Sequence, residues 1–367
     1  MNLPANIASR FSIITRYRYK WVMIIAIAWT LIDVIGWVRF MDLPYDERPD
    51  TVYVFLTPGA VILRAGIDFM MGLFMGNLLV FRLRRMFREY SMLITFISKT
   101  LMLILASFFM NFLVHISYSL FTLHLNLSQS LLNFKGEVLH RAWLFDKMTH
   151  WLIIFVVTQL LIEINEKYSP GVFVDILLGR YLTPRIEKRI IMFLDLKDST
   201  PIAEQLGHQQ YFLFIRDFIA SISMALLEHD GRIYQYVGDE VVVSWRYSTQ
   251  NMKRCIQAVI AARRAIQKRS EEFRRKYGLI PEFKVGMHLG DVTVGEIGII
   301  KKDLAMSGDT MNTTARIRNA CTDLNHKFIA SKDFIEHVDL KDWQAESLGE
   351  FELKGKSSSI ELFALRI

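Results

Sequence analysis

The sequence predicts two unlike parts: an α-helical membrane domain of about four transmembrane helices, followed by an α+β domain of the ferredoxin-like type. First, the 367 residues are 52% hydrophobic and 22% charged, which is too apolar for an ordinary soluble protein and too charged for one lying wholly within a bilayer. Second, the long apolar runs are confined to residues 21–163. Third, strand and helix signals after residue 186 follow the order β-α-β-β-α-β. We therefore expect a membrane domain over 1–164, a linker over 165–185 and the α+β domain over 186–367.

Four segments are long and apolar enough to cross a bilayer, since a helix needs about 20 mostly apolar residues to do so. They are residues 21–38, 60–81, 92–113 and 143–162. The spans identify the lipid bilayer as a partner of this chain. Two cysteines, Cys255 and Cys321, are too few for a disulfide framework or a four-cysteine zinc site, so we expect buried, reduced thiols.

The charges flanking these segments predict the orientation of the chain. Residues 1–20 carry four basic residues and no acid, and residues 82–90 carry four arginines and one glutamate. Residues 42–50 carry four acids and one arginine. Because basic flanks stay inside, we expect a multi-pass protein of the cell membrane with its N-terminus and α+β domain in the cytoplasm. The basic surplus, with a pI near 9.3, is attributed to these flanks, so no nucleic-acid partner is expected.

Charged residues also lie within the predicted spans: Asp33, Arg64, Asp68 and Lys99. Such residues usually face the interior of a helix bundle. Arg64 and Asp68 are four positions apart, so they are expected to pair on one helix face. Either these charges form a polar core that senses an unknown ligand, or they are a structural ion pair plus an interfacial lysine, and we favour the second reading.

Three histidines fall in or beside the second predicted outer loop: His124, His140 and His150. Their spacing fits no metal-binding template, so we interpret them as loop histidines.

The linker contains the helix-breaking sequence Ser169-Pro170-Gly171. A short amphipathic segment over residues 172–181 follows it. We expect a helix there, with Val174, Leu177, Leu178 and Tyr181 on one face. Such a helix either couples the two domains or is a domain-edge helix without a signalling role.

The α+β domain is predicted element by element. An apolar strand over 190–195 precedes a helix over 201–228, a hairpin of 232–237 and 240–245, and a helix over 250–277. A second hairpin of 283–289 and 292–297, a helix over 308–321, and strands over 328–330, 347–353 and 360–365 complete the domain.

Two carboxylates are predicted to meet at one edge of this sheet. Asp195 ends the first strand, and Asp239 lies in the tight turn of the first hairpin, which neighbours that strand in a ferredoxin-like sheet. Two converging carboxylates, completed by substrate phosphates, are typical of a Mg²⁺ site.

Several motifs, in order and correctly spaced, resemble those of the class III nucleotidyl cyclases, the adenylate and guanylate cyclase family. They are FLDLKDST at 193–200, YVGDE at 236–240, GEIG at 295–298, GDTMNTTAR at 308–316 and LKGK at 353–356. The resemblance covers about residues 186–367. It implies that Asp195, Asp239 and the backbone carbonyl of Leu196 bind two Mg²⁺ or Mn²⁺ ions.

The resemblance also implies a role for three residues beyond the metal ligands. Asn312 orients the ribose, Arg316 stabilises the pentavalent phosphate, and Lys354 contacts the terminal phosphates. In the family these groups come from the second chain of a head-to-tail dimer. A homodimer with two sites is therefore expected.

The two positions that select the base depart from the family. Adenylate cyclases typically have Lys with Asp or Thr, and guanylate cyclases Glu with Cys, whereas this chain has Gln235 and Ala305. An amide can pair with adenine or, flipped, with guanine. Asp303 is a weaker candidate for reading the base. We favour ATP, and GTP or a pyrimidine triphosphate stays open.

The leading hypothesis is therefore a membrane-anchored adenylate cyclase that converts ATP to 3′,5′-cyclic AMP and pyrophosphate. The alternative from another class is a catalytically inactive sensor that uses the cyclase fold to dimerise. A diguanylate cyclase is set aside because residues 237–241 lack that family's Gly-Gly-Asp/Glu-Glu-Phe turn. A transporter is disfavoured, since the four short spans carry no inverted repeat.

Overall fold

The structure is a computed structural model that describes residues 13–38, 58–83, 92–121, 123–139, 141–166, 172–299, 303–340, 343–352 and 359–367. The chain divides into two compact units, one within residues 1–167 and the other within residues 168–367, to which residues 12–14 are also assigned. Each unit is described by itself.

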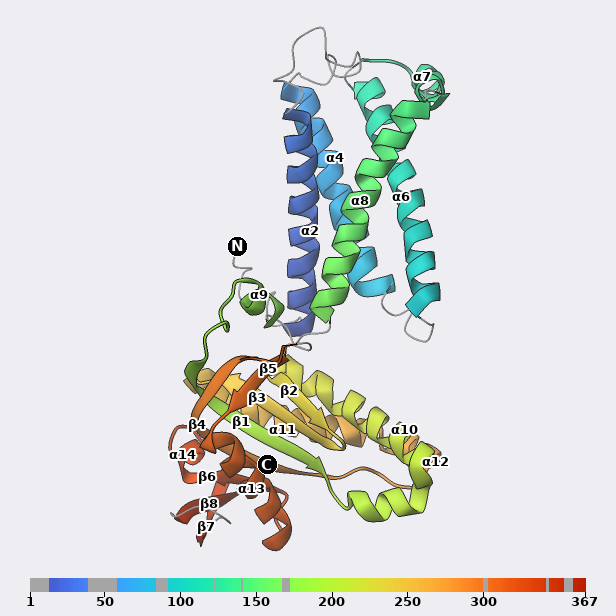
Figure 1. Cartoon of the computed structure of the whole chain (residues 1–367). Coiled ribbons are helices and arrows are strands. Elements are labelled where there is room, and N and C mark those ends of the chain that lie inside the picture. Colours follow the sequence, from blue (N-terminus) through green and yellow to red (C-terminus); the bar gives the residue numbers. More distant parts are fainter. Residues whose placement is uncertain are drawn as a thin grey trace. The chain divides into compact units, whose positions relative to one another are not determined.

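The N-terminal unit is a bundle of long apolar helices (Figure 1). These are α2 (Ile13–Val38), α4 (Pro58–Asn77) with its π-helical continuation η3 (Leu78–Leu83), α6 (Met92–Phe121) and α8 (Arg141–Glu166). Each of the four predicted spans lies in a helix long and apolar enough to cross a membrane, which confirms that prediction at the level of length and composition. A further helix, α7 (Leu127–Leu139), was not predicted.

Small residues and aromatic rings hold the bundle together. A Cβ atom added to Gly72 in α4 would lie 2.6 Å from the Cα atom of Ala26 in α2, so these two backbones are in direct contact. Trp29 packs against Phe155 and donates a hydrogen bond from its indole N–H to Thr158 at 2.8 Å.

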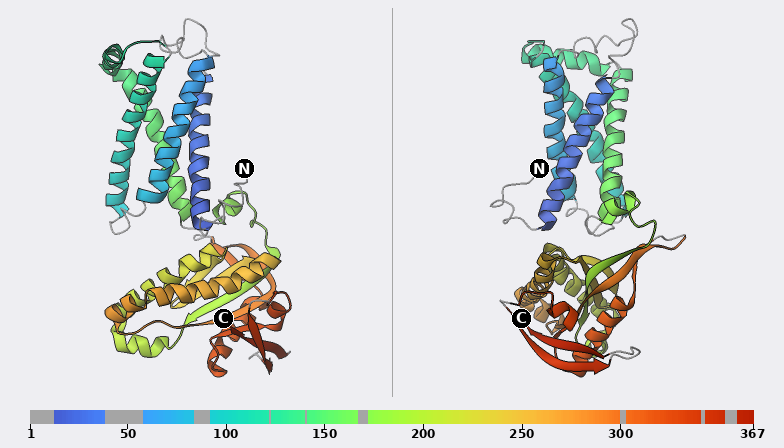
Figure 2. Two further views of the ribbon diagram at one scale, coloured as in Figure 1. Left: turned by 180° about the vertical axis from the view of Figure 1, so that it is seen from behind. Right: turned by 90° about the vertical axis from the view of Figure 1, so that its left-hand side faces the viewer.

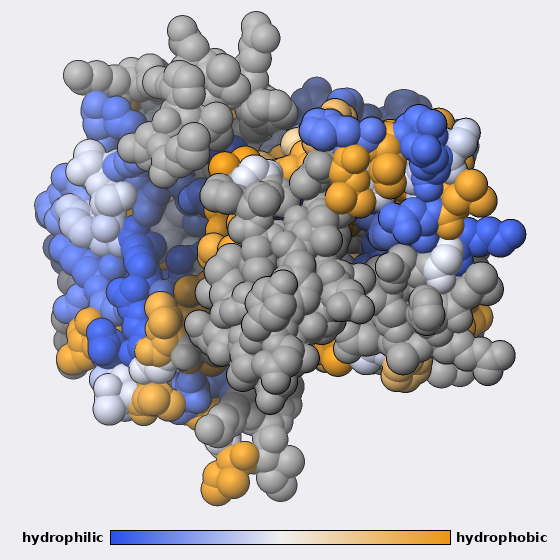
Figure 3. Space-filling model, turned by 90° about the horizontal axis from the view of Figure 1, so that it is seen from above, coloured by the Kyte–Doolittle hydropathy of each residue, from blue (hydrophilic) through white to orange (hydrophobic). Residues whose placement is uncertain are grey.

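The outer faces of these helices are apolar as well. In α2, for example, Ile24 and Ile35 are 53% and 60% exposed. Hydrophobic side chains are visible at the surface among hydrophilic ones in Figure 3. An apolar surface of this extent on a helix bundle is typical of contact with lipid rather than water.

The charges within the spans are arranged differently from the prediction. Arg64 does not pair with Asp68 four positions along α4, but with Asp33 of α2, to which Nη2 donates at 2.8 Å. Lys99 is not a lone interfacial lysine, because its ammonium group lies 3.0 Å from Glu163 of α8. Both pairs cross between helices, which sequence spacing along one helix cannot reveal.

The histidine prediction was partly wrong. His150 lies within α8, and its Nε2 atom is 3.9 Å from an oxygen of Asp33. His124 lies outside the helices, as expected, and His140 falls outside the described residues.

The C-terminal unit, coloured from green to red in Figure 2, contains a β-sheet with helices beside it. The sheet is mixed, with the strand order β2-β3-β1-β4-β6-β8-β7 and β5 paired to β4. Strands β4, β1, β3 and β2 pair antiparallel in the ferredoxin-like order, which confirms the predicted fold class. The strands are β1 (Arg185–Leu196), β2 (Arg232–Val237), β3 (Glu240–Arg246), β4 (Phe283–Ile297), β5 (Asp303–Ser307), β6 (Phe328–Ser331), β7 (Gln344–Glu352) and β8 (Ser359–Arg366).

Three helices cover one face of this sheet: α10 (Ser199–Glu228), α11 (Thr249–Lys268) and α12 (Ser270–Tyr277). Alternate β1 residues such as Ile190 and Met192 point into the core under these helices. Helix α10 also meets the length and hydropathy of a membrane span, but its apolar side belongs to this core.

Helix α13 (Asp309–Asp323) packs against β4 and β1, and the short helix α14 (Lys332–Ile335) follows β6. The thiols of Cys255 and Cys321 are free and buried, as predicted.

Two predicted elements were wrong in detail. Residues 283–297 form one continuous strand rather than a hairpin, and residues 283–294 of it pair with β1. Gly290 and Asp291 were interpreted as a turn, but a Cβ atom on Gly290 would lie 2.5 Å from the Thr310 hydroxyl, so the glycine admits close packing. The helix predicted over 250–277 is broken at Arg269 into α11 and α12.

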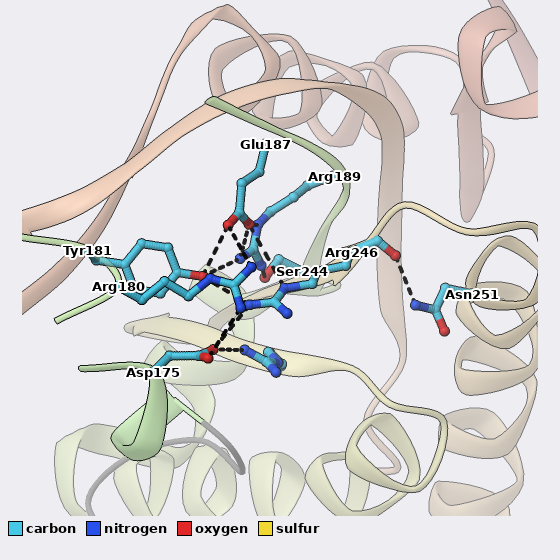
Figure 4. A network of polar contacts seen from close by, with 9 residues as sticks. Asp175, Arg180, Tyr181, Glu187, Arg189, Ser244, Arg246 and Asn251 are labelled. Carbon is cyan, nitrogen blue, oxygen red and sulfur yellow. Dashed lines mark hydrogen bonds and ion pairs between the residues drawn. The ribbon is translucent and has the colours of Figure 1, made fainter. Parts of the chain in front are cut away.

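The linker helix is shorter than predicted. Helix α9 (Val172–Leu177) ends before Tyr181, which is buried in the C-terminal unit, whereas Leu178 is 76% exposed. The predicted common apolar face is therefore wrong. A polar network attaches this segment to the sheet instead (Figure 4), with Asp175 accepting from Arg246 at 3.1 Å.

A buried arginine lies at the centre of that network. Arg189 of β1 is 1% exposed and contacts Glu187 at 2.6 Å and Ser244 at 3.2 Å (Figure 4). Its charge is thus compensated inside the unit.

Candidate active site

The strand register brings Asp195 to the first hairpin. Leu194 of β1 pairs with Val241 of β3, so Asp195 follows beside the turn that carries Asp239. The two carboxyl groups lie within hydrogen-bonding reach of one another. The structure therefore brings together the two acids that sequence reasoning selected.

An arginine that was not predicted lies against these acids. Arg318 of α13 donates to Asp195 at 3.0 Å, and its other terminal nitrogen is 2.6 Å from Glu240. A planar guanidinium suits such a bridge between two carboxylates. In the sequence, Arg318 is only a basic residue two positions after Arg316. Its contact with the acids cannot be predicted without knowledge of the fold.

Burial and neighbouring charges shift the pKa values of the acidic side chains in this site. Burial raises the pKa of the Asp195 carboxyl; Arg318 opposes that shift and the Asp239 carboxylate adds to it. Burial likewise raises the pKa of Glu240, against the effect of Arg318. These acids are crowded, and one guanidinium only partly balances their charge.

One oxygen of this group has no partner. The Oδ2 atom of Asp239 is buried and receives no hydrogen bond from the described residues. A buried carboxylate oxygen without a donor is costly unless a cation approaches it. The residues present therefore fit a divalent cation held between Asp195 and Asp239.

Among the described residues, no group of three or more His, Cys, Asp or Glu side chains is arranged to hold a metal ion. Any metal here depends on two aspartates, a backbone carbonyl such as that of Leu196, and oxygen atoms of a substrate.

Helix α13 presents its polar residues on two opposite flanks. Thr313 and Ile317 are fully buried and face the sheet. Successive residues turn by about 100°, so Asn312 and Arg316 share one flank about 40° apart, while Arg318 lies on the other. The flank that carries Arg318 faces Asp195 of the same chain.

The sheet and helix α13 approach closely where the site is formed. A Cβ atom on Gly286 of β4 would lie 2.5 Å from the backbone nitrogen of Arg318. Lys284, two residues earlier, pairs in register with Asp195 and was also missed by sequence reasoning. Strand pairing alone reveals it.

The two positions predicted to read the base lie on strands that do not pair with each other, since β2 pairs with β3 and β5 pairs with β4. Gln235 is exposed on β2, and Ala305 is half-buried on β5. The Met306 N–H donates to the Tyr234 hydroxyl at 3.0 Å, which joins these two strands next to both positions. Asp303 is exposed at the start of β5, and Lys354 falls outside the described residues.

A ferredoxin-like sheet with paired aspartates at the end of its first strand and in its first hairpin is compatible with a domain that binds a metal ion and a phosphate-bearing substrate. Residues 183–366 match the family "Adenylate and Guanylate cyclase catalytic domain". The chain belongs to this family, the class III cyclases.

Relatives agree with this assignment. The chain is 32% identical over 215 residues to Adenylate cyclase 2 of Rhizobium meliloti (strain 1021), covering 58% of each protein. It is 28% identical over 179 residues to Adenylate cyclase 1 of the same strain, covering 47% of this chain and 26% of the relative. The alignments thus span well under two thirds of these relatives.

The solved structure of a bacterial light-regulated adenylyl cyclase has the same fold as part of this chain. Its TM-score is 0.51 at 16% identity, over 59% of this chain and 64% of that one.

Proposed function

We propose that this protein is a membrane-anchored adenylate cyclase that converts ATP to 3′,5′-cyclic AMP and pyrophosphate. The family assignment and the adenylate cyclases among the relatives support a cyclase. The unpartnered oxygen of Asp239 beside Asp195 supports an active centre rather than an inactive sensor. A domain used only for dimerisation has no need to bury an unbalanced acid pair.

Asp195, Asp239 and the Leu196 carbonyl would hold Mg²⁺ or Mn²⁺, two ions per site as in the family. Such ions, when bound, lower the pKa of a ribose 3′-hydroxyl and balance the charge of the triphosphate. Arg318 donates a hydrogen bond to one oxygen of Asp195 and so orients the carboxylate. The other oxygen of Asp195 would then be available to a cation.

The proposal of a dimer is supported by the orientation of helix α13. Because Arg318 faces the Asp195 carboxylate of its own chain, Asn312 and Arg316 point to the opposite flank and away from that carboxylate. They serve a second copy, whose Asp195 and Asp239 complete a shared site. A homodimer then contains two such sites.

The chain's own residues contribute position and charge. Asn312 holds the ribose so that its 3′-oxygen lies in line with the α-phosphorus. As the new P–O bond forms, the bond to the β-phosphate oxygen breaks and pyrophosphate leaves. Arg316 balances the charge that develops on the α-phosphate, and Lys354 binds the terminal phosphates.

Gln235 would read the purine edge, opposite an Ala305 that offers no polar group. The amide accepts from the adenine N6 amino group and donates to N1. A single amide can turn to match guanine, so the preference for ATP is expected to be modest.

The helices α2, α4, α6 and α8 would span the cell membrane. Their apolar outer faces support contact with lipid. The basic residues of the N-terminal twenty residues and of residues 82–90 support a cytoplasmic N-terminus and catalytic unit.

Product analysis tests this function. The full chain in lipid nanodiscs is incubated with Mn²⁺ or Mg²⁺ and each of the four nucleoside triphosphates, and cyclic products are identified by mass spectrometry. We expect 3′,5′-cyclic AMP as the main product, and none from Asp239→Ala. No cyclic product from any triphosphate would favour the inactive sensor, and a main product from GTP or a pyrimidine triphosphate would overturn the assignment of ATP.

A further inference from the structure

The N-terminal unit encloses a polar cluster between apolar helices. Asp33 of α2 is 2% exposed. Two guanidinium nitrogens of Arg64 in α4 contact its carboxylate, and one of them donates a hydrogen bond at 2.8 Å. His150 of α8 approaches the same carboxylate at 3.9 Å. Two neighbouring helices, α4 and α8, thus direct charged or titratable groups at Asp33 of α2.

Asp68 lies beside this cluster, and no described group donates a hydrogen bond to its carboxyl oxygens. It is fully buried, and neither of its oxygens receives a hydrogen bond from the part of the chain that the structure describes. Lys99 of α6 does not balance it, since that ammonium pairs with Glu163 at 3.0 Å. Arg64 is the cation shared by both carboxylates, but its hydrogen bonds go to Asp33. An ionised Asp68 would therefore be an unbalanced charge in apolar surroundings.

We propose that Asp68 is a proton-binding site in which the neutral carboxylic acid donates its O–H to Asp33. The two carboxyl groups lie within hydrogen-bonding reach, and only a protonated one can serve as a donor to the other. The proton thereby satisfies Asp68 and completes the set of contacts to Asp33, which already accepts from Arg64.

A metal cation is a poorer occupant of the same position. Hard cations take about six oxygen ligands. The described residues contain no group of three or more acidic, His or Cys side chains arranged to hold a metal. A proton needs only the two carboxylates that are present.

The proton also affects helix packing. Helices α2 and α4 touch through Ala26 and Gly72, which keeps the backbone segments that carry Asp33 and Asp68 close together. Loss of the proton would leave two carboxylates facing a single Arg64 across the same interface. Binding of the proton therefore stabilises the close packing of these two helices.

The inference rests on the proposed placement of the helices in a bilayer, but not on cyclase activity. The test is infrared spectroscopy of the full chain in nanodiscs of neutral lipid at pH 7. We expect a carbonyl band of a protonated carboxylic acid that shifts in D₂O and is lost in Asp68→Asn. Glu163→Gln is the matched control and should keep the band, because Lys99 keeps Glu163 ionised.

Either absence of the band from the wild type or its persistence in Asp68→Asn would overturn the proposal. Should Asp68→Asn fail to fold, ¹³C NMR of aspartate carboxyl groups in the wild type gives the answer without a variant. One protonated aspartate signal at pH 7 is expected, and its absence would contradict the inference.

Discussion

Arg318 donates a hydrogen bond to Asp195 over 3.0 Å, although 123 positions separate the two residues in the chain. The contact fixes α13 against the end of β1 and places a permanent positive charge among the acids of the site. It also determines which flank of α13 is turned away. The proposed sharing of the site between chains depends on this one contact, and the charge of Arg318 opposes the binding of a metal cation beside it.

Arg318→Gln is expected to tighten the binding of Mn²⁺ in the absence of nucleotide. The change removes one positive charge near Asp195 and Glu240, which is worth roughly 1–2 kcal/mol to a divalent ion a few ångströms away in a water-like medium, or about tenfold in affinity. Electron paramagnetic resonance of free Mn²⁺ measures this directly.

Arg318→Lys is the matched control for this prediction. It keeps the charge and should bind Mn²⁺ like the wild type. Weaker or unchanged binding by Arg318→Gln would show that the arginine is not a competing cation in this site.

Gly286→Ala should destabilise the C-terminal unit and lower activity. The new methyl group would meet the backbone of Arg318 at 2.5 Å, and overpacking of this kind costs about 1–3 kcal/mol. Thermal unfolding of the full chain measures the loss. Gly136→Ala in α7, where nothing lies within 4 Å, is the control and should not lower stability. Equal effects of both variants would contradict the close approach of α13 to β4.

Glu187→Gln should destabilise the same unit strongly at neutral pH. Arg189 is buried against Glu187, and removal of one partner from a buried pair costs about 3–5 kcal/mol. Glu346→Gln removes an exposed partner of Arg366 and should cost only about 0–1 kcal/mol. A similar loss in both variants would show that the buried network adds nothing.

The effect of Glu187→Gln should depend on pH in one direction. Burial tends to raise the pKa of Glu187, but Arg189 and Arg246 together lower it below its ordinary 4.5. The native state thus favours the ionised form, so this stabilisation is complete above pH 4.5 and is lost as the pH falls through the lowered pKa. The difference in unfolding free energy between wild type and variant should therefore shrink as the pH falls. A difference that grows in acid would show that the native state does not favour the ionised form of Glu187.

Gln235→Lys combined with Ala305→Asp should sharpen the choice of ATP over GTP. A mismatched base would leave a buried polar group unpaired, at a cost of roughly 1–3 kcal/mol. The ratio of kcat/KM for the two nucleotides measures this effect, with the two single variants as controls. A wild type that already excludes GTP many thousandfold would show that these positions do not read the base.

Sequence patterns predicted the features that depend on local order. The apolar runs marked the long helices, and alternating strands with the Gly238-Asp239 turn marked the ferredoxin-like sheet and the meeting of Asp195 with Asp239. The motif around Asn312 and Arg316 placed both on one helix. Each of these depends on spacing along a single element or between neighbours in the chain.

Features that depend on packing between distant elements were missed. The partner of Arg64 is on another helix, and Arg318 reaches the acids only because Gly286 lets α13 lie close to β4. The continuous β4 strand was interpreted as a hairpin because Gly290 marks turns more often than close contacts. In each case the deciding interaction lies outside the local sequence.

The claim that each site is shared between two chains is tested most directly by mixing two inactive variants. Asp195→Ala chains keep Asn312 and Arg316, and Arg316→Ala chains keep both aspartates. Dimers of mixed composition, isolated by two affinity tags, should regain about half of the wild-type activity, since one of two symmetric sites is intact, while each variant alone stays inactive. Confirmed mixed dimers without activity would mean that each site is built within one chain, and would contradict the account.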